Sequence, residues 1–351
     1  MSPATMPPRM REAVRLLLVD AGAEVPTDHR FSELPQLLAP GDLLVVNDAA
    51  TLPASLPGRT AAGEDVELRL LAAAGDDPQP RRWWAVLFGA GDWREDTDLR
   101  PAPPTLLVGD ALVFAGELGA TVQAVSPASP RLLEVCFDRE GPQLWAALYR
   151  AGAPVQYSHL LEPLELWSVQ TVFAGRPWAV EMPSAGRPLT WALLAALEAR
   201  GIGVARLTHA AGLSATGDRS LDNLLPLPER YEIPGETVAA IREARSRGGR
   251  VIAVGTTVTR ALESEAEAIL AAGPPTTLAG ITTLVLTPAH RLRVVDALLT
   301  GMHGPGESHY RLLGAFLDRS ALDRAWQAAL ASGYRSHEFG DLALLLPARA
   351  A

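Results

Sequence analysis

Short apolar runs of strand length alternate with helical segments over most of this chain, and this alternation constrains the fold more than any other sequence feature. The first such run lies at 43–46 in GDLLVVND, and others follow at 177–182, 203–208, 250–255 and 293–300. Helical patterns of about ten to fifteen residues separate the later runs, as in PLTWALLAALEARG, ETVAAIREARSRGG and TRALESEAEAILAAG. The alternation predicts an α/β fold with a mainly parallel sheet covered by helices.

A different sequence pattern interrupts this alternation between about residues 56 and 138. It consists of strand-like runs separated by clusters of Gly, Pro and Asp, namely VELRLLAA, RRWWAVLF, TLLVGDALVFAG, ATVQAV and RLLEVCFD. No helical period of useful length appears there, so the stretch predicts a small β-barrel. We therefore expect residues 56–140 to form an inserted β-barrel domain, and residues 1–55 and 141–351 to form the α/β domain that carries the ligand cleft.

The composition limits the chemistry. The sequence contains no lysine, so all 31 basic residues of the Lys+Arg class are arginines. This excludes Schiff-base chemistry, attachment of pyridoxal phosphate and a Walker A lysine. A net charge of −9 disfavours a nucleic-acid partner, although an average charge can hide a basic patch. The sequence has no bilayer-spanning apolar run and no convincing signal peptide, so we expect a cytoplasmic protein without a membrane partner, as a monomer or weak oligomer.

Polar loops of small residues follow the predicted strands. In open α/β sheets, ligands bind beyond the carboxyl ends of the strands, where helix N-termini also point. We therefore expect these loops to meet in one cleft containing Asn47, Pro183, His209, Thr256 and His303. The loops are NDA at 47–49, MPSAG at 182–186, THAAGLSATGD at 208–218, GTT at 255–257 and TGMHGPG at 300–306.

Each of these side chains also has a purely structural interpretation. Thr256 or Thr257 is suited to capping the next helix, and His209 and His303 to ordinary loop hydrogen bonds. The arginines of REARSRGGR, at 242–250, are typical of a solvated helix C-terminus. His303, Glu307 and His309 are metal-binding residue types, but their spacing fits no common metal site, so no metal is expected. The five loops together favour a functional cleft more than any single residue does.

Several motifs, in order along the chain, resemble those of one known family. They are GDLLVVNDAATLPASLPGR, PSAG, LPERYEIP, GGRVIAVGTTVTRALES, RVVDALLTGMHGP and YRSHEFGD, which together span about 31–341. This set resembles the S-adenosylmethionine:tRNA ribosyltransferase-isomerase family of queuosine biosynthesis. The resemblance implies an α/β domain interrupted by a β-barrel. It also implies transfer of the ribosyl part of S-adenosylmethionine to a 7-aminomethyl-7-deazaguanine base in tRNA, rearrangement to an epoxy-cyclopentane, and release of adenine and methionine.

The resemblance also implies site residues, with S-adenosylmethionine as co-substrate and no metal. A sulfonium acidifies the adjacent C5′–H, so catalysis needs a positioned base. Glu229 in LPERYEIP aligns with a family acid and is the first candidate for this base, and His209 is the second. Tyr231, Phe316 or Tyr334 could supply an aromatic slot for adenine. The expected substrate-binding residues are Asn47, Asp48, Pro183, Ser184, Gly186, Gly255, Thr256, Thr257, Arg260 and His303.

The chain departs from the family pattern in several loops. The family's Pro-Thr-Ala-Gly-Leu-His-Phe appears as PSAGRPL at 183–189, its Asn-Thr-Arg-Val as DAAT at 48–51, and its Pro-Leu-Pro-Pro-Tyr corresponds to APVQYSHL. Three interpretations therefore stay open. The chain modifies tRNA as the family does, it is a divergent paralogue that uses S-adenosylmethionine on a small-molecule acceptor, or it binds S-adenosylmethionine or a nucleoside without catalysis.

Overall fold

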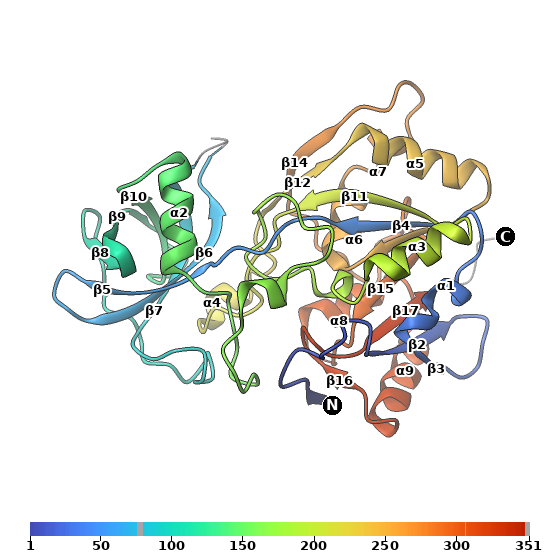
Figure 1. Ribbon diagram of the computed structural model, residues 1–351, viewed down its shortest axis with the longest axis horizontal. Helices are drawn as coiled ribbons and strands as arrows, with labels where there is room; N and C mark the ends of the chain where they lie inside the picture. Colours follow the sequence, from blue (N-terminus) through green and yellow to red (C-terminus); the bar gives the residue numbers. More distant parts are fainter. Residues whose placement is uncertain (76–79, 306, 348–351) are drawn as a thin grey trace.

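The computed structural model describes residues 1–75, 80–305 and 307–347. Two lobes are visible in Figure 1, a β-barrel on the left and a larger α/β lobe on the right, with irregular connections between them. The chain begins in the α/β lobe, leaves it after the strand at 43–47 to form the barrel, and then returns. The predicted α/β fold interrupted by a small barrel is confirmed.

The α/β lobe is built on a nine-stranded sheet. Its four central strands run parallel, as the alternating pattern predicted, while both flanks contain antiparallel pairs. Every residue of the central strands at 43–47 and 251–254 is buried, as expected for strands covered on both faces. The strand order is β14 (Leu278–Thr282), β12 (Glu229–Ile233), β11 (Gly203–His209), β4 (Leu43–Asn47), β13 (Val251–Val254), β15 (Ala297–Gly301), β17 (Leu342–Leu346), β2 (Arg15–Asp20) and β3 (Thr27–Arg30).

Helices cover both faces of this sheet. Neighbouring residues of a strand point to opposite faces, so Leu44 packs in one apolar cluster and Val45 in the other. The cluster around Val45 contains side chains of α5 (Gly235–Ser246), α6 (Thr256–Ser264), α7 (Ala266–Leu270), α8 (Ser308–Leu313) and α9 (Arg319–Ala331). The cluster around Leu44 contains side chains of η1 (Phe31–Glu33), α1 (Leu34–Leu37), η4 (Ser184–Gly186) and α3 (Trp191–Ala199).

The inserted lobe is a closed barrel of six antiparallel strands. Its interior is apolar and includes Leu68, Val86, Val122 and Leu133, none of which is exposed to solvent. The strand order is β10 (Leu132–Phe137), β7 (Arg82–Phe88), β6 (Asp65–Ala73), β5 (Ser55–Thr60), β8 (Ala111–Phe114) and β9 (Leu118–Val125), with η2 (Ala115–Glu117) between β8 and β9. The predicted run TLLVGDALVFAG forms a strand only at 111–114, because a turn interrupts it before residue 111.

The helix that follows the barrel packs against it. Helix α2 (Gly141–Ala151) contributes Leu144, Ala147 and Leu148 to the apolar cluster of the barrel, and Figure 1 shows α2 in the barrel lobe. Leu213 and Leu221, on the loop after β11 and on α4 (Arg219–Asp222), belong to the same cluster. The division into domains at 56–140 therefore stays a prediction, since the barrel's core also draws on the chain beyond residue 140.

The sequence did not predict several of the observed strands, and one predicted strand does not form. The run at 177–182 forms only an isolated bridge, between Ala179 and Thr51. The strand predicted at 293–300 begins at Ala297. The strands that were not predicted are β2, β3, β5, β12, β14 and β17. Further small elements are η3 (Leu166–Val169) and the two-residue pair β1 (Ser2–Pro3) and β16 (Arg335–Ser336).

Candidate functional site

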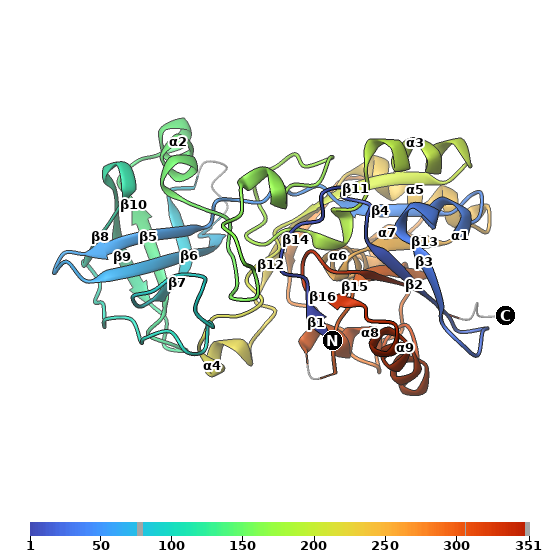
Figure 2. The same cartoon turned by 60° about the horizontal axis from the view of Figure 1, so that its bottom comes forward.

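A cavity of about 670 Å³ lies between the two lobes. Its floor contains the carboxyl ends of β13 and β15 and the start of β12, and its barrel side contains Asp96, Thr97 and Asp98. The loop segments 155–159, 180–185 and 211–215 line the space between them. The view in Figure 2 shows these connections between the barrel and the sheet. Of the five residues expected in one cleft, Pro183, Thr256 and His303 line this cavity, whereas Asn47 and His209 do not.

The GTT motif forms one wall. Strand β13 ends at Val254, Gly255 follows with φ 97°, and α6 begins at Thr256. Such a φ is in the left-handed region that glycine adopts most easily. Gly255 is the N-cap and no side chain caps the helix, so the threonines do not act as the ordinary caps considered above. Gly255, Thr256 and Thr257 all line the cavity, and the free first-turn N–H groups of α6 suit an anion or a hydroxyl group.

Glu229, the first residue of β12, lines the same cavity and is held by two partners. Its carboxylate forms an ion pair with the Arg260 guanidinium and accepts a 2.8 Å hydrogen bond from the N–H of Gly212. The Arg260 Nε–H in turn donates to the carbonyl of Leu284 at 2.8 Å, which fixes the guanidinium. Burial raises the pKa of Glu229, and Arg260 opposes that rise. A buried, oriented carboxylate of this kind is suited to accepting a proton near neutral pH.

His209 lies behind Glu229 and does not line the cavity. The ring is fully buried, and its Nε2 atom lies 3.6 Å from the Glu229 Oε2 atom. Burial, with the nearby charge of Arg260, lowers the pKa of His209 to about 3, so the imidazole is neutral. Of the two candidate bases, only Glu229 faces the space that a substrate would occupy.

Eight of the twelve predicted site residues line the cavity, and four lie outside its lining. The Asn47 side chain joins β4 to β11, accepting from the N–H of His209 and donating to its carbonyl, each at 2.9 Å. Asp48 accepts a 2.7 Å hydrogen bond from the Thr208 hydroxyl, and burial raises its pKa. Gly186 packs on the ring of Phe173. The cavity-lining residues are Pro183, Ser184, Glu229, Gly255, Thr256, Thr257, Arg260 and His303; the others are Asn47, Asp48, Gly186 and His209.

The three aromatic residues suggested for an adenine slot, Tyr231, Phe316 and Tyr334, do not line this cavity. Tyr231 and Tyr334 are buried elsewhere, with their hydroxyl groups donating to Glu265 and Asp28, and Phe316 packs in the main apolar cluster. Tyr157 contributes an aromatic ring to the cavity lining. The other large apolar side chains of the lining are Val155, Leu164, Val169, Val180, Met182, Leu213, Leu225, Pro226, Val254, Leu284, Val285, Leu286, Met302 and Leu312.

Glu181 is a cavity residue that the sequence analysis missed. Its Oε1 atom accepts hydrogen bonds from the Ser214 N–H at 2.9 Å and from the Ser214 hydroxyl at 3.1 Å, and also from the Tyr157 hydroxyl. Burial raises the pKa of this carboxyl group as well. The sequence did carry a signal, since Glu181 is a lone carboxylate directly before MPSAG, but the prediction of a strand at 177–182 concealed it.

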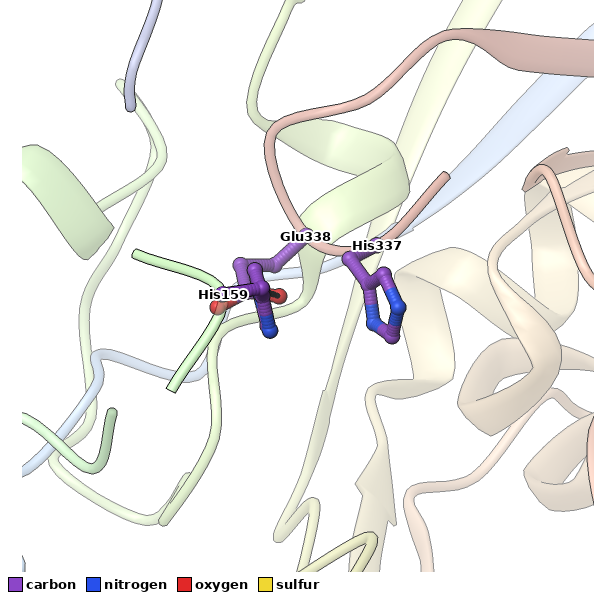
Figure 3. Close-up of side chains that lie close together, drawn as sticks. All are labelled: His159, His337 and Glu338. Carbon is purple, nitrogen blue, oxygen red and sulfur yellow. Dashed lines mark hydrogen bonds and ion pairs between the residues drawn. The ribbon is translucent and has the colours of Figure 1, made fainter. Parts of the chain in front are cut away.

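Histidines gather at one side of the cavity. His303 was predicted, and its Nε2 lies 3.0 Å from the hydroxyl oxygen of Thr300, while its ring stacks on His309 with centroids 4.9 Å apart. Burial lowers the pKa of His309 to about 4. His159 and His337, which were not predicted, also line the cavity and stack on each other (Figure 3). Their loops are 178 residues apart in sequence numbering, so local sequence patterns do not show that they meet.

Comparisons with known proteins agree with this architecture. A model of the queuosine biosynthesis protein family matches residues 2–345. The S-adenosylmethionine:tRNA ribosyltransferase-isomerase of Anaeromyxobacter dehalogenans (strain 2CP-C) is 37% identical over 351 residues, covering 98% of this chain and 95% of the relative. That of Gloeobacter violaceus is 38% identical over 349 residues, covering 98% and 92%.

A solved structure extends the likeness to three dimensions. The crystal structure of the S-adenosylmethionine tRNA ribosyltransferase from Thermotoga maritima is 25% identical, covers 98% of this chain and 96% of its own, and superposes with a TM-score of 0.52. Among the described residues, no helix is long and apolar enough to cross a membrane. The family match across nearly the whole chain confirms the resemblance seen in the motifs. This chain belongs to the queuosine biosynthesis protein family.

Proposed function

We propose that this chain is an S-adenosylmethionine:tRNA ribosyltransferase-isomerase. It transfers the ribosyl part of S-adenosylmethionine to a 7-aminomethyl-7-deazaguanine base of tRNA, with rearrangement to an epoxy-cyclopentane and release of adenine and methionine. Relatives with this enzyme name match 98% of the chain. The observation that carries the proposal is the cavity between the lobes, where a buried carboxylate, Glu229, lines the same space as the N-terminus of α6.

Glu229 is the proposed general base. The positive sulfur of S-adenosylmethionine acidifies the neighbouring C5′–H and makes methionine a good leaving group, so a correctly placed carboxylate can begin the reaction. Arg260 and the N–H of Gly212 hold the Glu229 carboxylate in one orientation. His209, neutral and buried against Glu229, is a positioning residue rather than a second base. The proposed steps assign no role to a metal.

The GTT wall is the proposed anchor for S-adenosylmethionine. The free N–H groups at the start of α6 and the hydroxyl groups of Thr256 and Thr257 can hold a carboxylate or ribose hydroxyl. Pro183 and Ser184, on the opposite loop, complete this part of the cavity. The adenine would lie against the aliphatic wall around Leu284 and Met302.

Transfer RNA is the proposed acceptor, because both lobes line the cavity and the relatives are named for this substrate. A small-molecule acceptor, or binding without catalysis, are the alternatives. A cytoplasmic location and a monomeric or weakly oligomeric state are further predictions, the first of which follows from a tRNA substrate.

Adenine release from S-adenosylmethionine labelled in its adenine tests the enzymatic part of the proposal. We expect release that requires tRNA carrying 7-aminomethyl-7-deazaguanine. Binding of S-adenosylmethionine without any adenine release would instead indicate a non-catalytic binder. Release that is independent of tRNA and rises with a small amine would indicate a small-molecule acceptor.

A further inference from the structure

Three side chains at the edge of the cavity form a compact group of metal-binding donors. Within the described part of the chain, one donor atom each of His159, His337 and Glu338 lie within 4.8 Å of one another. The Nε2 atom of His159 is 3.1 Å from the Oε2 atom of Glu338, and the two imidazole rings stack with centroids 4.3 Å apart and planes 24° apart. Figure 3 shows the three side chains converging from two separate loops.

The donor set has a specific chemical preference. Two imidazoles and one carboxylate are the protein ligands of many catalytic zinc sites, which keep a fourth position open. Hard cations such as Mg²⁺ prefer sets made of oxygen atoms, so nitrogen-rich sets favour Zn²⁺ and its neighbours in the transition series. The His159 Nε2 and Glu338 Oε2 atoms, 3.1 Å apart, already have a separation suited to two ligands of one ion. The two imidazole rings are stacked with planes 24° apart, so the His337 ring has to turn before its nitrogen can reach a bond of about 2.0–2.2 Å to the same ion.

The location of the group fits a bound ion. His159, His337 and Glu338 all line the cavity; the side chains of His159 and Glu338 are 12% and 23% exposed, whereas His337 is an exposed residue. An ion there has an entry path and space for a fourth ligand from the cavity. His337 has φ 68°, the left-handed conformation, in the loop between β16 and β17 that places it beside His159.

We propose that His159, His337 and Glu338 bind one divalent transition-metal ion of the zinc class. The ion links the loop after the barrel to the loop before β17 and leaves one coordination position facing the cavity. This site differs from the sequence motif of His303, Glu307 and His309, and it departs from the expectation of no metal. The inference does not depend on the proposed reaction, and it assigns the ion no step in it.

The test is Zn²⁺ binding to the full chain without a histidine tag, after dialysis against a chelator. We expect isothermal titration calorimetry to give about one ion per chain, which metal analysis after gel filtration would check. His159→Ala and His337→Ala should each lower the affinity by more than the roughly 10–100-fold typical of changes to outer-shell partners. Glu338→Gln should weaken binding in the same direction.

Two histidine variants outside the proposed site are controls for the loss of Zn²⁺ affinity. His29→Ala changes a histidine on β3 that is remote from the cavity lining, and it should leave Zn²⁺ affinity unchanged. His303→Ala tests the alternative cluster and should also retain binding. Thermal unfolding of each metal-free variant establishes that it is folded, and His159→Gln replaces His159→Ala if the latter is not.

Two results would overturn the inference. One is the absence of stoichiometric Zn²⁺ binding to the wild type, and the other is wild-type affinity in the double variant His159→Ala/His337→Ala. Because the titration contains neither S-adenosylmethionine nor tRNA, its outcome is separate from that of the proposed function. A chain that releases no adenine but binds Zn²⁺ through these three residues would contradict only the proposed function.

Discussion

Glu229 shows how burial and a partner adjust one carboxylate for proton transfer. Its pKa is raised because the group is buried, while Arg260 and the Gly212 N–H limit the rise and fix the orientation. At the residue scale, the motif LPERYEIP pointed to Glu229 because the motif resembles that of the family. Nothing within the motif indicated that the Glu229 carboxylate would contact Arg260 and Gly212. Those contacts depend on α6 and on the loop after β11, which come together only in the folded chain.

We predict that Glu229→Gln abolishes most of the turnover and leaves S-adenosylmethionine affinity nearly unchanged. A general base acts mainly in the transition state, and its loss typically costs about 10²–10⁴-fold in rate. Single-turnover kinetics and calorimetry measure the two quantities separately. The matched control is Glu236→Gln, an exposed glutamate on α5 that should retain full activity.

The pH dependence of kcat/KM is a second test of Glu229 as the general base. Only the deprotonated form of Glu229 can accept a proton, so kcat/KM should fall as the pH drops through its raised pKa. The Glu229→Gln variant should lack this acid limb in its residual rate. An identical acid limb in wild type and variant, or undiminished turnover in the variant, would assign the base elsewhere.

His209 provides a stability prediction at the residue scale. Its folded-state pKa of about 3 lies below the unfolded value of 6.5, so its contribution is fully present above pH 6.5 and is lost as the pH falls towards 3. Between pH 6.5 and 5, this one group should lower the free energy of unfolding by about 2 kcal/mol. Urea unfolding at both pH values should therefore show a smaller pH-dependent loss in His209→Leu than in the wild type. An equal loss in both proteins would show that His209 is not buried in its neutral form.

The GTT motif acts at the scale of an element, because it both ends β13 and starts α6. The sequence predicted this strand and a helix after it, since a fully apolar run, a glycine and an amphipathic pattern follow one another directly. The single helix predicted for TRALESEAEAILAAG is divided into α6 and α7, which are separated at Glu265. The prediction failed at 177–182, where an apolar run forms only a single bridge. That segment crosses between the lobes. Its backbone bonds to the segment after β4 and to the loop after β11, and Val180 packs in the barrel cluster.

We predict that Thr256→Val together with Thr257→Val weakens S-adenosylmethionine binding. Valine keeps the shape and removes the hydroxyl group, so each lost hydrogen bond should cost on the order of 1 kcal/mol. Calorimetry on the double variant measures the loss. Thr259→Val is the control, because Thr259 is on the same helix but its hydroxyl donates to the Gly255 carbonyl and does not line the cavity. Undiminished affinity in the double variant would exclude the GTT wall as the anchor.

At the scale of the whole molecule, the cavity lies between the strand ends of the sheet, the loops that connect the lobes, and the barrel-lobe segment Asp96, Thr97 and Asp98. The strand and helix patterns of the sequence predicted both lobes. They did not predict that the loop segments 155–159, 180–185 and 211–215 line the space between the lobes. The arginine-rich segment 242–250 is likewise explained only by tertiary contacts. Arg242 donates to carbonyl groups at the end of α7, Arg250 pairs with Asp42, and Arg245 and Arg247 pair with Asp296 and Glu243. These ion pairs and hydrogen bonds support the structural interpretation of that cluster over a phosphate-binding patch.

The central claim is that this chain modifies a 7-aminomethyl-7-deazaguanine base in tRNA with the ribosyl part of S-adenosylmethionine. The most direct measurement is mass spectrometry of nucleosides from tRNA that carries this base, after incubation with the protein and S-adenosylmethionine. We expect the 7-aminomethyl-7-deazaguanosine peak to be replaced by its epoxy-cyclopentane derivative with wild-type protein, and to persist with Glu229→Gln. An unchanged 7-aminomethyl-7-deazaguanosine peak with folded wild-type protein that binds S-adenosylmethionine would contradict the proposed function.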